Sequence, residues 1–196
     1  MFYVVLKNHL HKAALTALMG GFLFSLISGV ALAGSYESSN FLGQPYTGDG
    51  GQATAAYLDM PGGFTYDSDG NIYIADTFNN AIRKINTSGV ISTISGTGEF
   101  GHKDGSTSEA EWAWPQGIAR ATDGTLYIAD TFNNAIRKIA SGKVSTLSLT
   151  SKLSRPNAII LSGSTLFISD NGNSRIVKIS TGGGSVTEVK TGISNP

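Results

Sequence analysis

The stretch Tyr73-Ile-Ala-Asp-Thr-Phe-Asn-Asn-Ala-Ile-Arg-Lys-Ile85 decides the fold, because it recurs letter for letter at residues 127–139. A looser third copy occupies residues 167–179. Each unit opens with a proline, at spacings of 54, 41 and 40 residues, and a large apolar residue stands three positions before each of them. The four prolines are Pro61, Pro115, Pro156 and Pro196. A period of this length predicts stacked supersecondary units that share one continuous core.

Each unit consists of four short β-prone runs separated by turns such as Asp69-Gly70, a dipeptide typical of hairpins. Within the third run, Ile82 and Ile85 are three residues apart, so in a strand they point to opposite faces of the sheet. A sheet that is apolar on both faces must lie between two others. The pattern therefore predicts an all-β β-propeller of four-stranded blades. In the first unit the four runs are residues 63–66, 72–75, 81–85 and 90–94.

At these residues the units resemble NHL repeats. The family pattern, roughly P-x-G-[IV]-A-[VI]-D-x-x-G-[NT]-[IL]-Y-[VI]-A-D-[TS]-x-N-[NH]-R-[IV]-[RQ]-K, is matched well by residues 61–84 and 115–138, and less closely by 156–178. The resemblance covers residues 41–196 and implies NHL-type blades. The arginine that usually follows the Asn pair is replaced by Ala81 and Ala135, and is present only as Arg175. We therefore expect no role for that arginine in the first two units.

The resemblance implies a ring of six blades, whereas residues 34–196 supply three, with a fourth unit opening at Pro196. Residues 35–41 align where an outermost fourth strand is expected. Three alternatives remain open. The chain is a piece of a longer protein, two copies associate to complete the ring, or the three blades form an open arc.

Residues 1–33 predict a secretory signal peptide. Lys7 and Lys12 precede an uncharged, largely apolar run, which contains Ala31-Leu32-Ala33, a small-x-small cleavage pattern. Cleavage there predicts a secreted or periplasmic protein. The alternative is an uncleaved membrane anchor, because the uncharged run extends from Ala13 to Tyr36 and could span a bilayer.

Composition excludes several classes of function. Fourteen basic and 14 acidic residues balance, which gives no basic face for nucleic acid. The absence of cysteine excludes disulfides, thiolate metal sites and cysteine nucleophiles. We expect neither a cofactor nor a metal ion.

A binding face is predicted where the long insertions, residues 43–60 and 96–114, meet the turns between second and third strands. The candidate ligand-binding residues there are Phe78, Phe132, His102 and Trp114. For the two phenylalanines the alternative is packing between blades. His102 as a general base is not favoured, since no G-x-S-x-G motif accompanies it.

Polar residues follow the second strand of every unit. Asp and Asn at such positions commonly cap turns by accepting backbone N–H groups, and Asn tolerates left-handed backbone. We therefore interpret them as turn caps rather than metal ligands or catalytic groups. They are Asp76, Asp130, Asp170, Asn80 and Asn134.

These observations favour a secreted, non-catalytic propeller that binds a protein, peptide or glycan through one loop face. Enzymatic activity is uncertain and less favoured than binding. The enzymatic alternative is a calcium-dependent lactonase- or lyase-like propeller, for which Asn157, Asp67 and Asp123 are the available oxygen ligands.

Overall fold

The computed structural model describes residues 48–194 and 196, which belong to the compact unit of residues 37–196. The predicted signal peptide and the strand expected at residues 35–41 lie outside the described residues. Among the residues that are described, no helix has the length and apolarity needed to cross a membrane.

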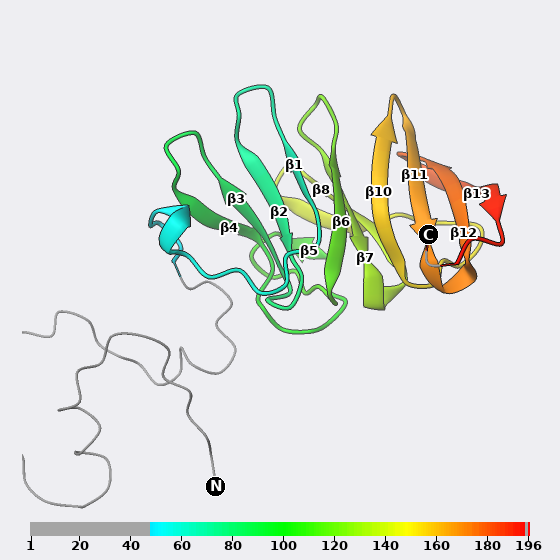
Figure 1. Ribbon diagram of the computed structural model, residues 1–196, viewed down its shortest axis with the longest axis horizontal. Helices are drawn as coiled ribbons and strands as arrows, with labels where there is room; N and C mark the ends of the chain where they lie inside the picture. Colours follow the sequence, from blue (N-terminus) through cyan, green and yellow to red (C-terminus); the bar gives the residue numbers. More distant parts are fainter. Residues whose placement is uncertain (1–47, 195) are drawn as a thin grey trace, which may run out of the picture. The chain divides into compact units, whose positions relative to one another are not determined.

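Three antiparallel sheets follow one another along the chain, one for each repeat (Figure 1). The first blade contains β1 (Phe64–Tyr66), β2 (Ile72–Asp76), β3 (Ala81–Ile85) and β4 (Ile91–Ser95). The strands pair in sequence order, as consecutive hairpins do. The prediction of an all-β fold with propeller-type blades is confirmed.

The second blade contains β6 (Pro115–Arg120), β7 (Leu126–Asp130), β8 (Ala135–Ala140) and β9 (Lys143–Thr146). It has a fifth strand that the repeat pattern did not predict, because β5 (Gly105–Ser106) from the long insertion pairs with β9.

The third blade contains β10 (Pro156–Ser162), β11 (Thr165–Asp170), β12 (Arg175–Ser180) and β13 (Gly183–Thr191). Three single-turn 3₁₀ segments complete the described structure: η3 (Ala53–Ala55), η4 (Thr131–Asn133) and η5 (Asn171–Asn173).

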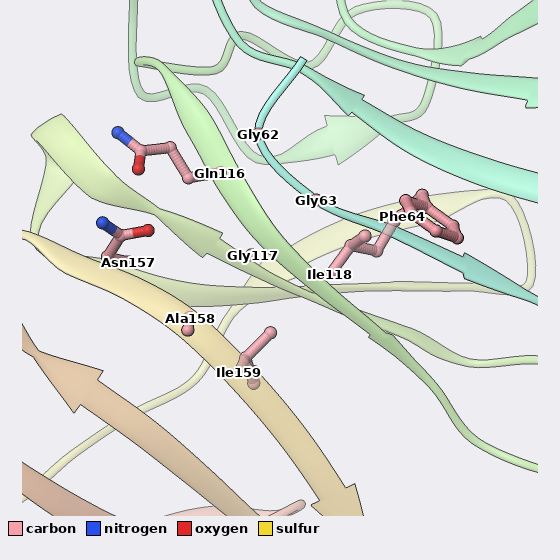
Figure 2. A pocket seen from close by; sticks show the side chains of 9 residues that line it. All are labelled: Gly62, Gly63, Phe64, Gln116, Gly117, Ile118, Asn157, Ala158 and Ile159. Carbon is pink, nitrogen blue, oxygen red and sulfur yellow. The ribbon is translucent and has the colours of Figure 1, made fainter. Parts of the chain in front are cut away.

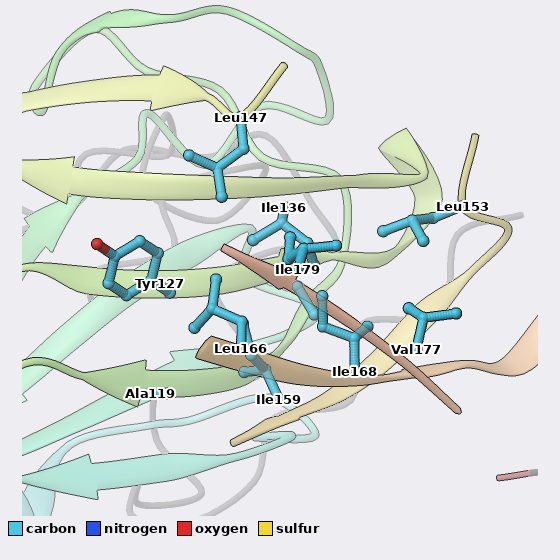
Figure 3. Packing of buried hydrophobic residues seen from close by; sticks show 11 residues of the cluster. Ala119, Tyr127, Ile136, Leu147, Leu153, Ile159, Leu166, Ile168, Val177 and Ile179 are labelled. Atoms are coloured by element: carbon cyan, nitrogen blue, oxygen red, sulfur yellow. The ribbon is translucent and has the colours of Figure 1, made fainter. Parts of the chain in front are cut away.

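The core lies between the blades. Ile82 is fully buried in a cluster with Ile118, Leu126 and Ile128 of the second blade, whereas Ile85 lines a hollow on the opposite side of the first blade. The predicted opposite orientation of the two isoleucines is therefore confirmed. A second cluster joins the second and third blades (Figure 3). Trp112, the large apolar residue three positions before Pro115, is fully buried.

The β1–β2 turn is organised by the Asp67 carboxylate, which accepts hydrogen bonds from the backbone N–H groups of Asp69 and Asn71 and from the Tyr73 hydroxyl. A further bond from the Asn71 side-chain amide is the largest contribution lowering the pKa of Asp67, from 3.8 to about 2.

Because this carboxyl has a lower pKa in the folded chain than in the unfolded one, it stabilises the fold above about pH 4, and that stability is lost as the pH falls toward 2. We expect Asp67→Asn to reduce the acid sensitivity of unfolding in this window, as measured by circular dichroism in urea. A variant with the same steep loss of stability between pH 4 and 2 as the wild type would contradict this assignment.

Candidate functional site

The turn between the second and third strands is tied to the segment that opens the same blade. The backbone N–H of Phe78 donates to the carbonyl oxygen of Asp59 at 3.1 Å, and that of Phe132 donates to Ala113 at 3.0 Å. Gly172 makes the same bond to Ser154 in the third blade. The tip of each turn is therefore held against the chain that precedes the opening proline.

The aspartates that end the second strands have other partners than those predicted. Asp130 and Asp170 make no capping bond to the 3₁₀ turns that follow them. Instead, each carboxylate accepts two hydrogen bonds. One comes from the backbone N–H of the residue two positions before the blade's opening proline, 16 or 17 residues earlier, and the other from the side-chain amide of the asparagine three residues later. The pairs are Asp76 with Asp59 and Asn79, Asp130 with Ala113 and Asn133, and Asp170 with Ser154 and Asn173.

A buried arginine completes this arrangement in the first two blades. Arg83 Nη1 lies 3.0 Å from Asp76 Oδ2, and Arg137 Nη1 lies 2.9 Å from Asp130 Oδ2. The first two units have alanine where the family pattern has arginine, as the sequence shows, but Arg83 and Arg137 supply an ion pair with the same aspartate. Residues two apart in a strand share one face, so Arg83 replaces an arginine at position 81 without leaving that face. The third blade uses Arg175 Nε, 2.7 Å from Asp170 Oδ2.

The long lead-in loops supply a second carboxylate that sequence reasoning missed. Asp49 lies 2.6 Å from Arg83 and accepts the backbone N–H of Thr93, while Asp104 lies 2.8 Å from Arg137 and accepts that of Thr146. Each loop is thereby fixed to the outermost strand of its own blade. The sequence does repeat an Asp-Gly pair in the two loops, as Gly48-Asp-Gly and Lys103-Asp-Gly. The blade pattern does not include these loops and so gave the two aspartates no role.

Burial and hydrogen bonding act in opposite directions on these carboxyl groups. Burial raises the pKa of Asp76 and of Asp130 above the ordinary value. Burial acts the same way on Asp104, but the N–H of Thr146 and the Arg137 guanidinium outweigh it and lower the pKa of this carboxyl. The acid–arginine pairs are structural connections inside each blade.

A second set of bonds joins each blade to the next one. The Thr77 hydroxyl donates to the carbonyl oxygen of Pro115, and the Thr131 hydroxyl donates to that of Pro156, both at 2.8 Å. Asn80 Oδ1 accepts the backbone N–H of Trp114, and Asn134 Oδ1 accepts that of Arg155. The two asparagines have the left-handed backbone expected for them, with φ of +48° and +54°. Their side chains act between blades rather than within the turn.

The residue before each opening proline has a left-handed backbone too, with φ of +45° at Met60, +51° at Trp114 and +48° at Arg155. Such values are uncommon for bulky side chains and persist only where surrounding structure enforces them. Asn80 and Asn134 supply that constraint for Trp114 and Arg155.

Backbone hydrogen bonds fix both the turn tips, Phe78 and Phe132, and the residues before the opening prolines, Trp114 and Arg155. The side chains at these positions form a continuous line across the blades. The ring centroids of Phe78 and Trp114 are 4.5 Å apart, and those of Trp114 and Phe132 are 4.3 Å apart. Phe100 contacts Phe132 edge-on at 6.2 Å, and the Arg155 guanidinium lies 5.7 Å from the Phe132 ring. We call these five side chains the aromatic row. Phe78 and Phe132 are 39% and 40% exposed, and Phe100 is 57% exposed.

The structure therefore brings three of the four predicted binding residues together: Phe78, Trp114 and Phe132. The rings of the two phenylalanines contact Trp114 between them, as the packing alternative expects, and they remain exposed, so their role in binding stays a prediction. His102 is exposed, and its Nε2 lies 3.1 Å from the Thr146 hydroxyl on β9. Sequence reasoning missed Phe100 and Arg155, which extend the row.

A separate shallow pocket of about 190 Å³ lies along the inner strands β1, β6 and β10 (Figure 2). Gln116 and Asn157 are the polar side chains that line it. Asp67 and Asp123, the other oxygen ligands considered for calcium, do not line this pocket. Both carboxylates accept hydrogen bonds from their own turns. Across residues 48–194, no group of three or more acidic or histidine side chains is placed to hold a metal ion.

Comparison with known sequences gives consistent matches. Residues 29–108 match the family profile of the Teneurin NHL domain. NHL repeat-containing protein 2 from Gallus gallus is 41% identical over 83 residues, which are 42% of this chain and 11% of that protein. The matched segments span only 4% to 11% of the curated relatives' own lengths.

Comparison with solved structures gives propeller-like neighbours. A protein of unknown function from Bacteroides thetaiotaomicron is 26% identical, with a TM-score of 0.54 over 59% of this chain and 34% of that one. Virginiamycin B lyase from Staphylococcus aureus, an inactive variant solved with quinupristin, is 24% identical with a TM-score of 0.50, over 66% of this chain and 41% of the lyase. The second likeness concerns the fold alone.

Proposed function

We propose that this chain, which belongs to the NHL-repeat β-propeller family, is a non-catalytic binding module whose ligand lies along the aromatic row. The observation that carries the proposal is the exposure of three rings in one connected line, at positions that the blade framework fixes. The ligand class is an extended peptide, a segment of a protein or a glycan.

The chemistry of the row suits such ligands. Half-exposed aromatic side chains offer a large contact area at a low cost in conformational entropy. Proline rings and the apolar faces of sugar rings both pack against them. Rings of this size on a framework held by backbone hydrogen bonds need little reorganisation on binding, which favours affinity. Arg155 adds a cation at one end of the row.

We also propose that the module acts outside the cytoplasm, in the periplasm or as a secreted protein. The support is the pattern of residues 1–33, with its basic start, apolar run and small-x-small end. N-terminal sequencing of the exported protein tests this: a start at Gly34 is expected, and a start at Met1 in the membrane fraction would contradict it.

Binding along the row predicts a specific loss in Trp114→Ala. The probes are a proline-rich dodecapeptide and the tetrasaccharide of N-acetylglucosamine, titrated against the full chain. Binding of either is followed by intrinsic fluorescence, since Trp112 is fully buried and Trp114 is partly exposed, and by calorimetry for the variant. We expect Trp114→Ala to weaken binding at least about tenfold, or about 1.4 kcal/mol.

The matched control is Tyr66→Ala, which removes an aromatic side chain that is 72% exposed and is not part of the row. Its affinity should equal that of the wild type. Saturable binding that survives Trp114→Ala unchanged would show that the ligand lies elsewhere, and the absence of binding by both probes would contradict the proposed ligand class.

A further inference from the structure

The first blade leaves partly open the apolar face that the second and third blades bury. We call it the leading face. In the second blade its members Ile118, Leu126, Ile128 and Ile139 are at most 8% exposed, and in the third blade Ile159, Leu166, Ile168 and Ile179 are at most 7% exposed. Their counterparts in the first blade line an open hollow of about 440 Å³. Phe64 is 71% exposed there, Ile72 and Ile85 are partly exposed, and Ile74 is 8% exposed. These counterparts are Phe64, Ile72, Ile74 and Ile85.

The third blade presents the complementary face, which we call the trailing face. In the second blade this face contributes Ala119, Tyr127 and Ile136, which are 7%, 6% and 0% exposed because the third blade covers them. The residues at the same repeat positions in the third blade are Ile160, Phe167 and Ile176. Ile160 is 65% exposed, and the other two are partly exposed.

The described residues therefore carry both halves of an interface that the same chain already forms twice. Figure 1 shows the two sheets that carry these faces, β1–β4 and β10–β13, at opposite ends of the described blades. A trailing face packs on a leading face at the first junction and again at the second. We propose that the leading face of one copy binds the trailing face of a second copy, head to tail.

The contacts of the existing junctions indicate how the new one is made. At each junction the threonine hydroxyl in the turn of one blade donates to the carbonyl oxygen of the next blade's opening proline. The asparagine of the same turn accepts the backbone N–H of the residue before that proline. The third blade has Asn171 and Ser174 at the two turn positions, and the first blade has Met60 and Pro61 at the opening pair. Asn171 and Ser174 provide polar side chains for the same two bonds.

A head-to-tail contact either closes into a ring or continues as a filament, depending on the rotation between copies. In a pair of copies joined at both ends, the described residues would supply six blades, and each leading face would be covered by a trailing face. We expect this closed pair, because each closure buries two end faces at about 25 cal/mol per Å² of apolar surface.

The test is sedimentation velocity of the full chain at about 1–50 µM, a range that resolves monomer from dimer when the dissociation constant is micromolar. We expect twice the chain mass. Phe64→Asp blocks the leading face and Ile160→Asp blocks the trailing face, and both substituted side chains are exposed in the single copy, so the fold should survive. Each variant alone should weaken association at least tenfold.

Mixing the two variants separates a head-to-tail pair from a symmetric one. The intact leading face of Ile160→Asp can bind the intact trailing face of Phe64→Asp, so the mixture should regain a dimer held by one junction. If like faces paired instead, one of the two variants would associate alone and the mixture would gain nothing, which would overturn the proposal. A wild-type chain that stays monomeric throughout this range would overturn it too.

Phe100→Asp is the control, because it removes a similarly exposed ring from the aromatic row and not from either end face. It should leave association unchanged. Ligand binding at the row and association through the end faces are thus measured by different variants, so either result can fail without the other.

Discussion

Replacing Arg137 with methionine is expected to lower the free energy of unfolding by about 3–5 kcal/mol, which is a large part of the stability of a domain of this size. The Arg137 side chain is fully buried and contacts the carboxylates of Asp130 and Asp104. It also donates to the carbonyl oxygens of Lys103 and Glu111 and lies over the Trp112 ring. Methionine preserves much of the volume but leaves the fully buried Asp130 without its cation.

Urea unfolding followed by circular dichroism measures this loss, and the melting temperature should fall by about 10 °C or more. The control is Arg175→Met in the third blade. Its side chain is 17% exposed, and its second partner, Glu188, is 52% exposed, so solvent screens part of the interaction and a loss of about 1–2 kcal/mol is expected. Equal losses in the two variants would show that burial of the guanidinium contributes little.

Gly117→Ala should destabilise the fold by about 3 kcal/mol or more, because the inner strands of the second and third blades leave no room for a methyl group. A Cβ at Gly117 would clash with the Asn157 carbonyl oxygen and would lie 2.9 Å from the Ile159 nitrogen and 3.0 Å from the Ala158 Cα. All three neighbours are backbone atoms, so relief requires the two blades to move apart.

The matched control is Gly182→Ala, in an exposed turn where the nearest atom to the new Cβ is the Ser180 hydroxyl oxygen at 3.7 Å. That variant should unfold within about 0.5 kcal/mol of the wild type. Thermal unfolding of both variants decides the matter. A Gly117→Ala chain as stable as the control would mean that the junction between these blades is looser than the structure has it.

The blades were predictable because strand period, turn dipeptides and exact repetition all indicate the same architecture. The orientation of Ile82 and Ile85 followed from the two-residue period alone. Phe78 and Phe132 could be selected as candidates because an apolar side chain in the middle of a polar turn needs a partner or a ligand. Trp114 could be selected because it ends the long insertion that was expected to meet those turns.

Sequence reasoning failed where the partner of a side chain is far along the chain. The capping interpretation of Asp76 expected backbone donors from the turn itself. The turn contributes only the side-chain amide of Asn79, and the backbone donor, Asp59, is 17 residues away. The family pattern compares residues position by position, so it did not indicate that Arg83, two residues after Ala81 and on the same strand face, makes the ion pair with Asp76. Asp49 and Asp104 lie 34 and 33 residues from their arginines, and no periodicity of a single strand relates residues at that separation.

The left-handed residue ahead of each opening proline has a consequence for how such chains diversify. Met60, Trp114 and Arg155 are three chemically unlike side chains on the same backbone conformation. The framework thus sets where this side chain lies but does not restrict its chemistry. Exchange or duplication of whole units can then rewrite the order of apolar, aromatic and cationic groups along the surface while the junctions between blades stay intact. Ligand recognition in this architecture can therefore change by substitution in one repeat at a time, without a change in the backbone of the others.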